Sequence, residues 1–122
     1  MIEELVTLET AKMLKEKGFN KFCSFAYIDE YCNLMSVHTT NSLIDKMGLG
    51  YSAPNQSFAQ KWLRETKNLH IEISYMYGNY WIYDILTIPE HDLVGLSDRP
   101  IIRYETYEEA LEAGIFEALK LI

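Results

Sequence analysis

The residues that could carry out chemistry are few and lie far apart in the sequence. His38, His70 and His91 do not form the short spacings of a metal site. Cys23 and Cys32 are the only cysteines, and they do not form a Cys-x-x-Cys pair. Because we expect a reducing compartment, we interpret both as thiols, and a disulfide between them is the alternative. No nucleophile signature surrounds either cysteine. We therefore predict no catalytic residue, no metal and no cofactor.

A strand pair in the second half of the chain holds the side chains that could bind a ligand. Residues 69–77 and 80–87 flank Gly78 and Asn79, a sequence typical of a two-residue hairpin loop. That loop would place Tyr77 opposite Tyr80 and Ser74 opposite Tyr83. The hairpin would then carry Ile71, Ile73, Tyr75 and Ile82 on one face, and His70, Met76, Trp81 and Tyr83 on the other.

This second face has two open interpretations. Met76, Trp81 and Tyr83 could form an exposed apolar patch that binds a partner. Alternatively, the N-terminal segment covers the face, and Trp81 and Tyr83 belong to the core.

Asp84 is a polar residue that this register places on the apolar face of the hairpin. If buried, it needs a partner such as a tyrosine hydroxyl or Arg103. Asp84, His70, Tyr83 and Arg103 are the candidate polar groups of a pocket between the sheet and the N-terminal segment.

The elements that position these residues follow from local sequence patterns. In the first half we predict a helix that begins after Thr7 and ends near Gly18, strands over 22–28 and 31–37, and a short helix over 41–47. The short helix over 41–47 lies in a polar stretch, 38–57, that we interpret as a connection within one domain.

The second half has clearer boundaries. A helix over 55–67 ends near Asn68, two strands follow, and residues 100–104 give a third strand. Thr106 and Glu109 form a capping box at the start of the last helix, and Gly114 falls where that helix would approach the sheet closely. We predict one α+β domain over residues 1–122, with an N-terminal αββ segment followed by αβββα, and an antiparallel sheet packed by helices.

The αβββα order is the topology of the double-stranded RNA-binding domain. That family grips phosphates with a basic cluster at the start of its last helix, whereas this chain has Glu105, Glu108 and Glu109 there. The formal charge is −7, which disfavours nucleic acid and anionic membranes as partners. No apolar run is long enough to span a membrane, and the first residues lack a signal-peptide pattern. We expect a cytoplasmic protein.

Three segments resemble a group of small uncharacterised proteins found in phages, prophages and mobile elements of gut bacteria of the Bacteroides type. They are LETAKMLKEKGF (8–19), YSAPNQSFAQKWLRE (51–65) and YEEALEAGIFEALKLI (107–122). The resemblance implies a bacterial host cytoplasm and carries no activity. We expect a non-enzymatic interaction protein that binds a cytoplasmic protein or itself; the alternative is a small-molecule binder or minor enzyme.

Overall fold

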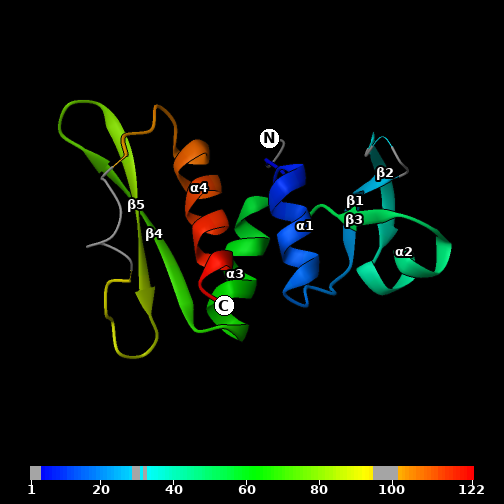
Figure 1. Cartoon of the computed structure of the whole chain (residues 1–122). Helices are drawn as coiled ribbons and strands as arrows, with labels where there is room; N and C mark the ends of the chain where they lie inside the picture. Colours follow the sequence, from blue (N-terminus) through cyan, green and yellow to red (C-terminus); the bar gives the residue numbers. More distant parts are fainter. Residues whose placement is uncertain (1–3, 29–30, 32, 95–101) are drawn as a thin grey trace. The chain divides into compact units, whose positions relative to one another are not determined.

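The computed structural model of the chain describes residues 4–28, 31, 33–94 and 102–122 (Figure 1). Four helices and two antiparallel sheets occur among these residues, so the predicted α+β class is confirmed. The backbone forms two compact units, Met1–Asn55 and Gln56–Ile122, which we call the N-terminal and the C-terminal unit. The assignment of residues 1–122 to one domain stays a prediction.

The N-terminal unit has a three-stranded antiparallel sheet and two helices. Its elements are α1 (Leu8–Glu16), β1 (Cys23–Ile28), β2 (Asn33–Thr39), α2 (Asn41–Met47) and β3 (Gly50–Ser52). The strand order is β2-β1-β3, so β1 is central and β2 is an outer strand (Figure 1).

The ends of α1 form as the sequence predicts. The Thr7 hydroxyl accepts a hydrogen bond from the Thr10 amide at 3.4 Å. At the other end Gly18 has a φ of 97°, and the Phe19 amide donates to the Leu14 carbonyl at 2.9 Å. This is the six-to-one bond of a Schellman motif, which only a residue with positive φ allows.

The stretch 38–57 is more ordered than a connection. It contains the predicted helix α2 and also β3, a strand that the sequence analysis missed. β3 pairs with β1 through Gly50, Tyr51 and Ser52. A side chain at Gly50 would lie 2.9 Å from the Tyr27 carbonyl oxygen and from Ile28 Cδ1, so the pairing requires glycine there.

The C-terminal unit packs two helices on one hairpin. Its elements are α3 (Gln56–Thr66), β4 (Leu69–Met76), β5 (Tyr80–Thr87) and α4 (Tyr107–Lys120). α3 and α4 lie side by side, and α4 contacts both strands (Figure 1). Its core consists of apolar residues from all four elements: Ala59, Trp62, Leu63, Leu69, Ile71, Tyr83, Ile85, Leu86, Ala110, Leu111, Ile115, Ala118 and Leu119.

The predicted two-residue hairpin loop is wrong. Met76 pairs with Tyr80, so the loop has the three residues Tyr77, Gly78 and Asn79. The Asn79 amide donates to the Met76 carbonyl at 3.2 Å, and both Gly78 (φ 106°) and Asn79 (φ 65°) have positive φ. Tyr77 therefore belongs to the turn instead of ending the first strand, while Gly78 and Asn79 lie in the turn as predicted.

This one-residue difference in register moves side chains between faces. Ile71 pairs with Ile85, Ile73 with Tyr83, and Tyr75 with Trp81. The predicted separation of Trp81 and Tyr83 from the isoleucines of β4 is therefore wrong, since cross-strand partners share a face.

The helix α4 begins and packs as predicted. The Glu109 amide donates to the Thr106 hydroxyl at 3.1 Å, which confirms Thr106 as the N-cap. A side chain at Gly114 would lie 2.6 Å from Ile71 Cγ2 and 3.2 Å from the Tyr83 ring. Glycine thus lets α4 approach the face of the hairpin that carries Ile71 and Tyr83.

The third strand of the predicted αβββα order is not confirmed. Tyr104 forms an isolated antiparallel bridge with Trp81, through hydrogen bonds of 2.8 and 2.9 Å. Residues 100 and 101 lie outside the described residues, and Ile102 and Arg103 are not in a strand. The topology of a double-stranded RNA-binding domain is therefore not established.

Candidate functional site

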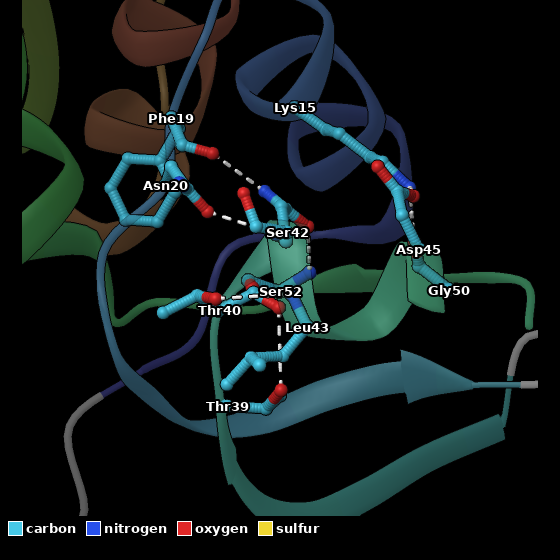
Figure 2. A network of polar contacts seen from close by, with 11 residues as sticks. Lys15, Phe19, Asn20, Thr39, Thr40, Ser42, Leu43, Asp45, Gly50 and Ser52 are labelled. Carbon is cyan, nitrogen blue, oxygen red and sulfur yellow. Dashed lines mark hydrogen bonds and ion pairs between the residues drawn. The ribbon is translucent and has the colours of Figure 1, made fainter. Parts of the chain in front are cut away.

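The placement of α2 creates a hollow in the N-terminal unit, and a buried asparagine fixes that placement. The Asn41 side chain donates to the Phe19 carbonyl at 2.8 Å and accepts from the Ser52 amide at 2.9 Å (Figure 2). Asn41 is only 4% exposed. One side chain therefore ties the start of α2 to β3 and to the segment that follows α1.

Further polar contacts hold the first and second turns of α2 (Figure 2). The Thr40 hydroxyl caps the helix by accepting from the Leu43 amide at 3.2 Å, and Asn20 Oδ1 accepts from the Ser42 amide at 2.9 Å. On the second turn Asp45 forms an ion pair with Lys15. Because these bonds come from three separate segments, α2 has a fixed position over the sheet.

A pocket of about 420 Å³ lies between α2 and the strands β1 and β2. Met35, Val37 and Thr39 of β2 form one wall, and the register of β2 with β1 shifts by one residue between Ser36 and Thr39. The other lining residues are mostly aliphatic: Ile28, His38, Leu43, Ile44, Met47, Gly48 and Leu49. His38 and Thr39 are the polar side chains of the lining.

The rim of this pocket exposes large apolar side chains to solvent. Met47 is 86% exposed, Leu49 54% and Met35 46%. Scattered apolar residues are normal on a surface, but a group around one concave site is typical of a binding surface. We call the lining residues together the α2 pocket.

The lining of the α2 pocket contains no carboxylate, thiol or lysine, and its polar side-chain groups are the His38 ring and the Thr39 hydroxyl. His38 is exposed and its ring stacks on Phe22, with centroids 4.8 Å apart. The pocket is suited to apolar side chains or to a small apolar molecule.

The six binding residues predicted from the sequence lie on different surfaces of the structure. They are His70, Met76, Trp81, Tyr83, Asp84 and Arg103. Tyr83 is buried on the face that α4 covers, at 4% exposure. Trp81 is on the same face and is half-buried. The centre of its ring lies 4.7 Å from that of Tyr75 and 5.5 Å from that of Tyr107, which it meets edge-on. Trp81 therefore packs against both β4, through Tyr75, and the first residue of α4, Tyr107.

The other predicted residues lie on the opposite face of the hairpin or beside it. By register, His70, Met76 and Asp84 share the face away from Tyr83, and Asp84 pairs with Glu72. Asp84 is thus not on the apolar face, which corrects the sequence analysis. The Arg103 guanidinium lies 4.5 Å from the centre of the Tyr80 ring.

His70 has one unusual feature. Its Nδ1 atom is buried and has no hydrogen-bond partner among the described residues. His70, Met76, Asp84 and Arg103 do not line the α2 pocket, which belongs to the N-terminal unit. The sequence analysis missed this pocket, although the uncharged strand 33–39 and the apolar residues at 43, 47 and 49 were available signals.

Cys23 is a buried free thiol, and Cys32 lies outside the described residues. Burial raises the pKa of the Cys23 thiol from its ordinary 9.0 to about 11. A thiol with this pKa is protonated at neutral pH, and only the thiolate is a good nucleophile. Cys23 is therefore a packing residue.

Across the described parts of the chain, no group of three or more histidine, cysteine, aspartate or glutamate side chains could hold a metal ion. The helices in those parts are all too short or too polar to cross a membrane.

No protein-family model, no curated protein and no solved structure matches the chain.

Proposed function

We propose that the chain is a non-enzymatic interaction protein that binds an apolar segment of a cytoplasmic protein in the α2 pocket. The observation that carries this proposal is the group of exposed aliphatic side chains, Met35, Met47 and Leu49, around an apolar hollow. Methionine side chains are flexible and polarizable, which suits them to surfaces that adapt to a partner's side chains.

The kind of partner follows from the lining. Because the wall is aliphatic and has no charged group, it favours Leu, Ile, Val or Met side chains and penalises the burial of a charge. An amphipathic helix presents such side chains at spacings of three and four residues. The proposed partner is therefore a protein with an exposed amphipathic helix, in the cytoplasm of a bacterium that carries the phage or prophage.

A pair of matched variants tests this function. Met47 is the last residue of α2, and Leu121 is the C-cap of α4, 48% exposed and outside the pocket. A lysine at either position is compatible with the helix dipole. We expect wild type and Leu121→Lys to capture the same protein from host lysate, and Met47→Lys to lose it. Capture that Met47→Lys leaves unchanged would contradict the role of the pocket.

A small apolar ligand is the second candidate function, and the volume of the pocket supports it. About 420 Å³ lies in the range of small-molecule sites. Fluorescence of an uncharged apolar dye such as Nile red measures this directly. Dye binding that Met47→Lys abolishes, in a protein that captures no partner, would favour the small-molecule function.

A further inference from the structure

Aromatic side chains form a row near the loop end of the hairpin in the C-terminal unit. Tyr75 of β4 pairs with Trp81 of β5, and Trp81 pairs in turn with Tyr104 through an isolated antiparallel bridge. Because residues directly opposite each other share a face, the three side chains lie next to one another. The Tyr104 ring also lies 6.1 Å from that of Tyr83, on the same face. We call Tyr75, Trp81 and Tyr104 the aromatic row.

The aromatic row is accessible to solvent, and its rings are held in place. Tyr75 is 58% exposed, and Trp81 and Tyr104 are half-buried. Tyr107, which meets Trp81 edge-on, is 39% exposed. The Tyr75 hydroxyl donates to Asn79 Oδ1 at 2.8 Å, which fixes the ring at the exposed end of the row. Rings that are already ordered lose little conformational entropy when a ligand binds.

The spacing of the aromatic row matches that of a polyproline II helix. Neighbouring strands lie about 4.8 Å apart, so the backbones that carry Tyr75 and Tyr104, two steps apart, are separated by about 10 Å. A polyproline II helix has three residues per turn and rises about 3.1 Å per residue, so prolines at positions i and i+3 lie about 9 Å apart on one side. Two such prolines would therefore each meet an outer ring, with Trp81 between them.

The charges near the aromatic row are acidic. The exposed Glu105 directly follows Tyr104, and the first turn of α4 adds two further glutamates. The strands β4 and β5 contain no lysine or arginine. The neighbouring basic residue, Arg103, lies over the ring of Tyr80, which the register places on the other face of the hairpin. A ligand with a positive charge is therefore complementary to this surface.

We propose that the aromatic row binds a proline-rich segment of another protein, in the polyproline II conformation, and that a lysine or arginine of this segment pairs with Glu105. Surfaces lined by aromatic rings recognise such segments because the polyproline II helix is already formed before binding. The inference goes beyond the proposed function. The aromatic row belongs to the C-terminal unit and the α2 pocket to the N-terminal unit, and a cationic proline-rich ligand differs from an aliphatic one.

A synthetic hexaproline peptide with two arginines at each end is the probe, and titration calorimetry measures its affinity. Tyr75→Ala removes an exposed outer ring of the row and should weaken binding by about tenfold. Tyr31→Ala, at a tyrosine of the N-terminal unit that is 78% exposed, is the matched control and should bind like wild type. Binding should also change the tryptophan emission through Trp81, because the other tryptophan, Trp62, is buried in the core.

A charge exchange tests the role of Glu105. Glu105→Lys should weaken binding of the arginine peptide by about fivefold. It should strengthen binding of a second hexaproline peptide that has glutamates in place of the arginines. Glu90→Lys makes the same charge change at an exposed residue beyond the opposite end of β5, and it should leave both affinities close to those of wild type. Because Glu105 is exposed, this comparison decides the question even if Tyr75→Ala lowers stability.

Several results would overturn the proposal. One is a wild type that does not bind the arginine peptide at millimolar concentration, and another is a Tyr75→Ala variant that binds it as tightly as wild type. Equal binding of a hexaglycine peptide with the same arginines would reduce the contact to charge alone. A change in tryptophan emission with an uncharged oligosaccharide, and none with the peptide, would assign the row to a sugar. Met47→Lys separates this proposal from the proposed function, because it should lose the captured partner and still bind the peptide.

Discussion

At the scale of single residues, burial of the Cys23 thiol links folding to alkaline pH. Its pKa is about 11 in the folded chain and 9.0 for an exposed thiol. Between these values the unfolded thiol loses its proton while the folded one keeps it. The unfolded state then binds fewer protons, so the free energy of unfolding falls as pH rises through this window.

We predict that this contribution amounts to about 2 to 3 kcal/mol over the full window. Urea unfolding of wild type and Cys23→Ala at pH 8 and near pH 11 measures it, because the other titrating groups are common to both chains. Wild type should lose more stability than Cys23→Ala between the two pH values. Parallel losses would show that the thiol titrates normally.

A second prediction at this scale concerns the N-cap of α4. Thr106→Ala removes the hydroxyl that accepts from the Glu109 amide at 3.1 Å. The free energy of unfolding should fall by about 1 kcal/mol, with an unchanged denaturant slope. Thr106→Ser keeps the acceptor and should stay close to wild type. An equal loss in both variants would assign the effect to something other than the cap.

At the scale of elements, the contact between α4 and the hairpin depends on Gly114. Alanine normally improves a helix by about 1 kcal/mol over glycine. At Gly114 its Cβ would lie 2.6 Å from Ile71 Cγ2, and overpacking of a core costs about 1 to 3 kcal/mol. We therefore expect Gly114→Ala to lower the melting temperature.

The combination with Ile71→Leu, which removes the Cγ2 methyl from the β-carbon, is the internal control. If the clash is the cause, the double variant should lose less stability than the two single variants together. Additive losses would contradict the close approach of α4 to β4.

The corrected register gives a further prediction for β4 and β5. Glu72 and Asp84 are direct cross-strand partners, and like charges in that position destabilise a sheet. Glu72 is exposed, so it can be changed without a cavity. Glu72→Lys should stabilise the chain by about 0.2 to 1 kcal/mol, and Glu72→Gln by less.

High salt should reduce the gain of Glu72→Lys, because the interaction is electrostatic and near solvent. The two-residue loop would instead place Asp84 opposite Ile73. An unchanged stability in Glu72→Lys would therefore favour that register over the three-residue loop.

At the scale of the whole molecule, charge restricts the choice of partners. The net charge of −7 and the glutamates at the start of α4 oppose contact with phosphate backbones. We predict no measurable binding of duplex RNA or DNA at physiological salt in a gel-shift assay. Salt-sensitive retention of either duplex would require a basic surface that the sequence does not indicate.

Helix boundaries are the features that the sequence by itself determined. Thr7 and Thr106 cap their helices, Gly18 and Phe19 end α1, and Asn68 adopts the predicted left-handed conformation with a φ of 56°. Each of these depends on hydrogen bonds and backbone preferences within about one helical turn. A local pattern is therefore sufficient to predict them.

Only the tertiary structure decided the hairpin register and the α2 pocket. The register depends on whether Tyr77 belongs to the turn or to the strand, because both a two-residue and a three-residue loop can contain Gly78 and Asn79. The pocket depends on Asn41, which bonds to Phe19 and Ser52, twenty-two residues before it and eleven after it. Contacts between distant segments leave no periodic signal in the sequence, so the surface that binds in our proposal emerges only when the chain is folded.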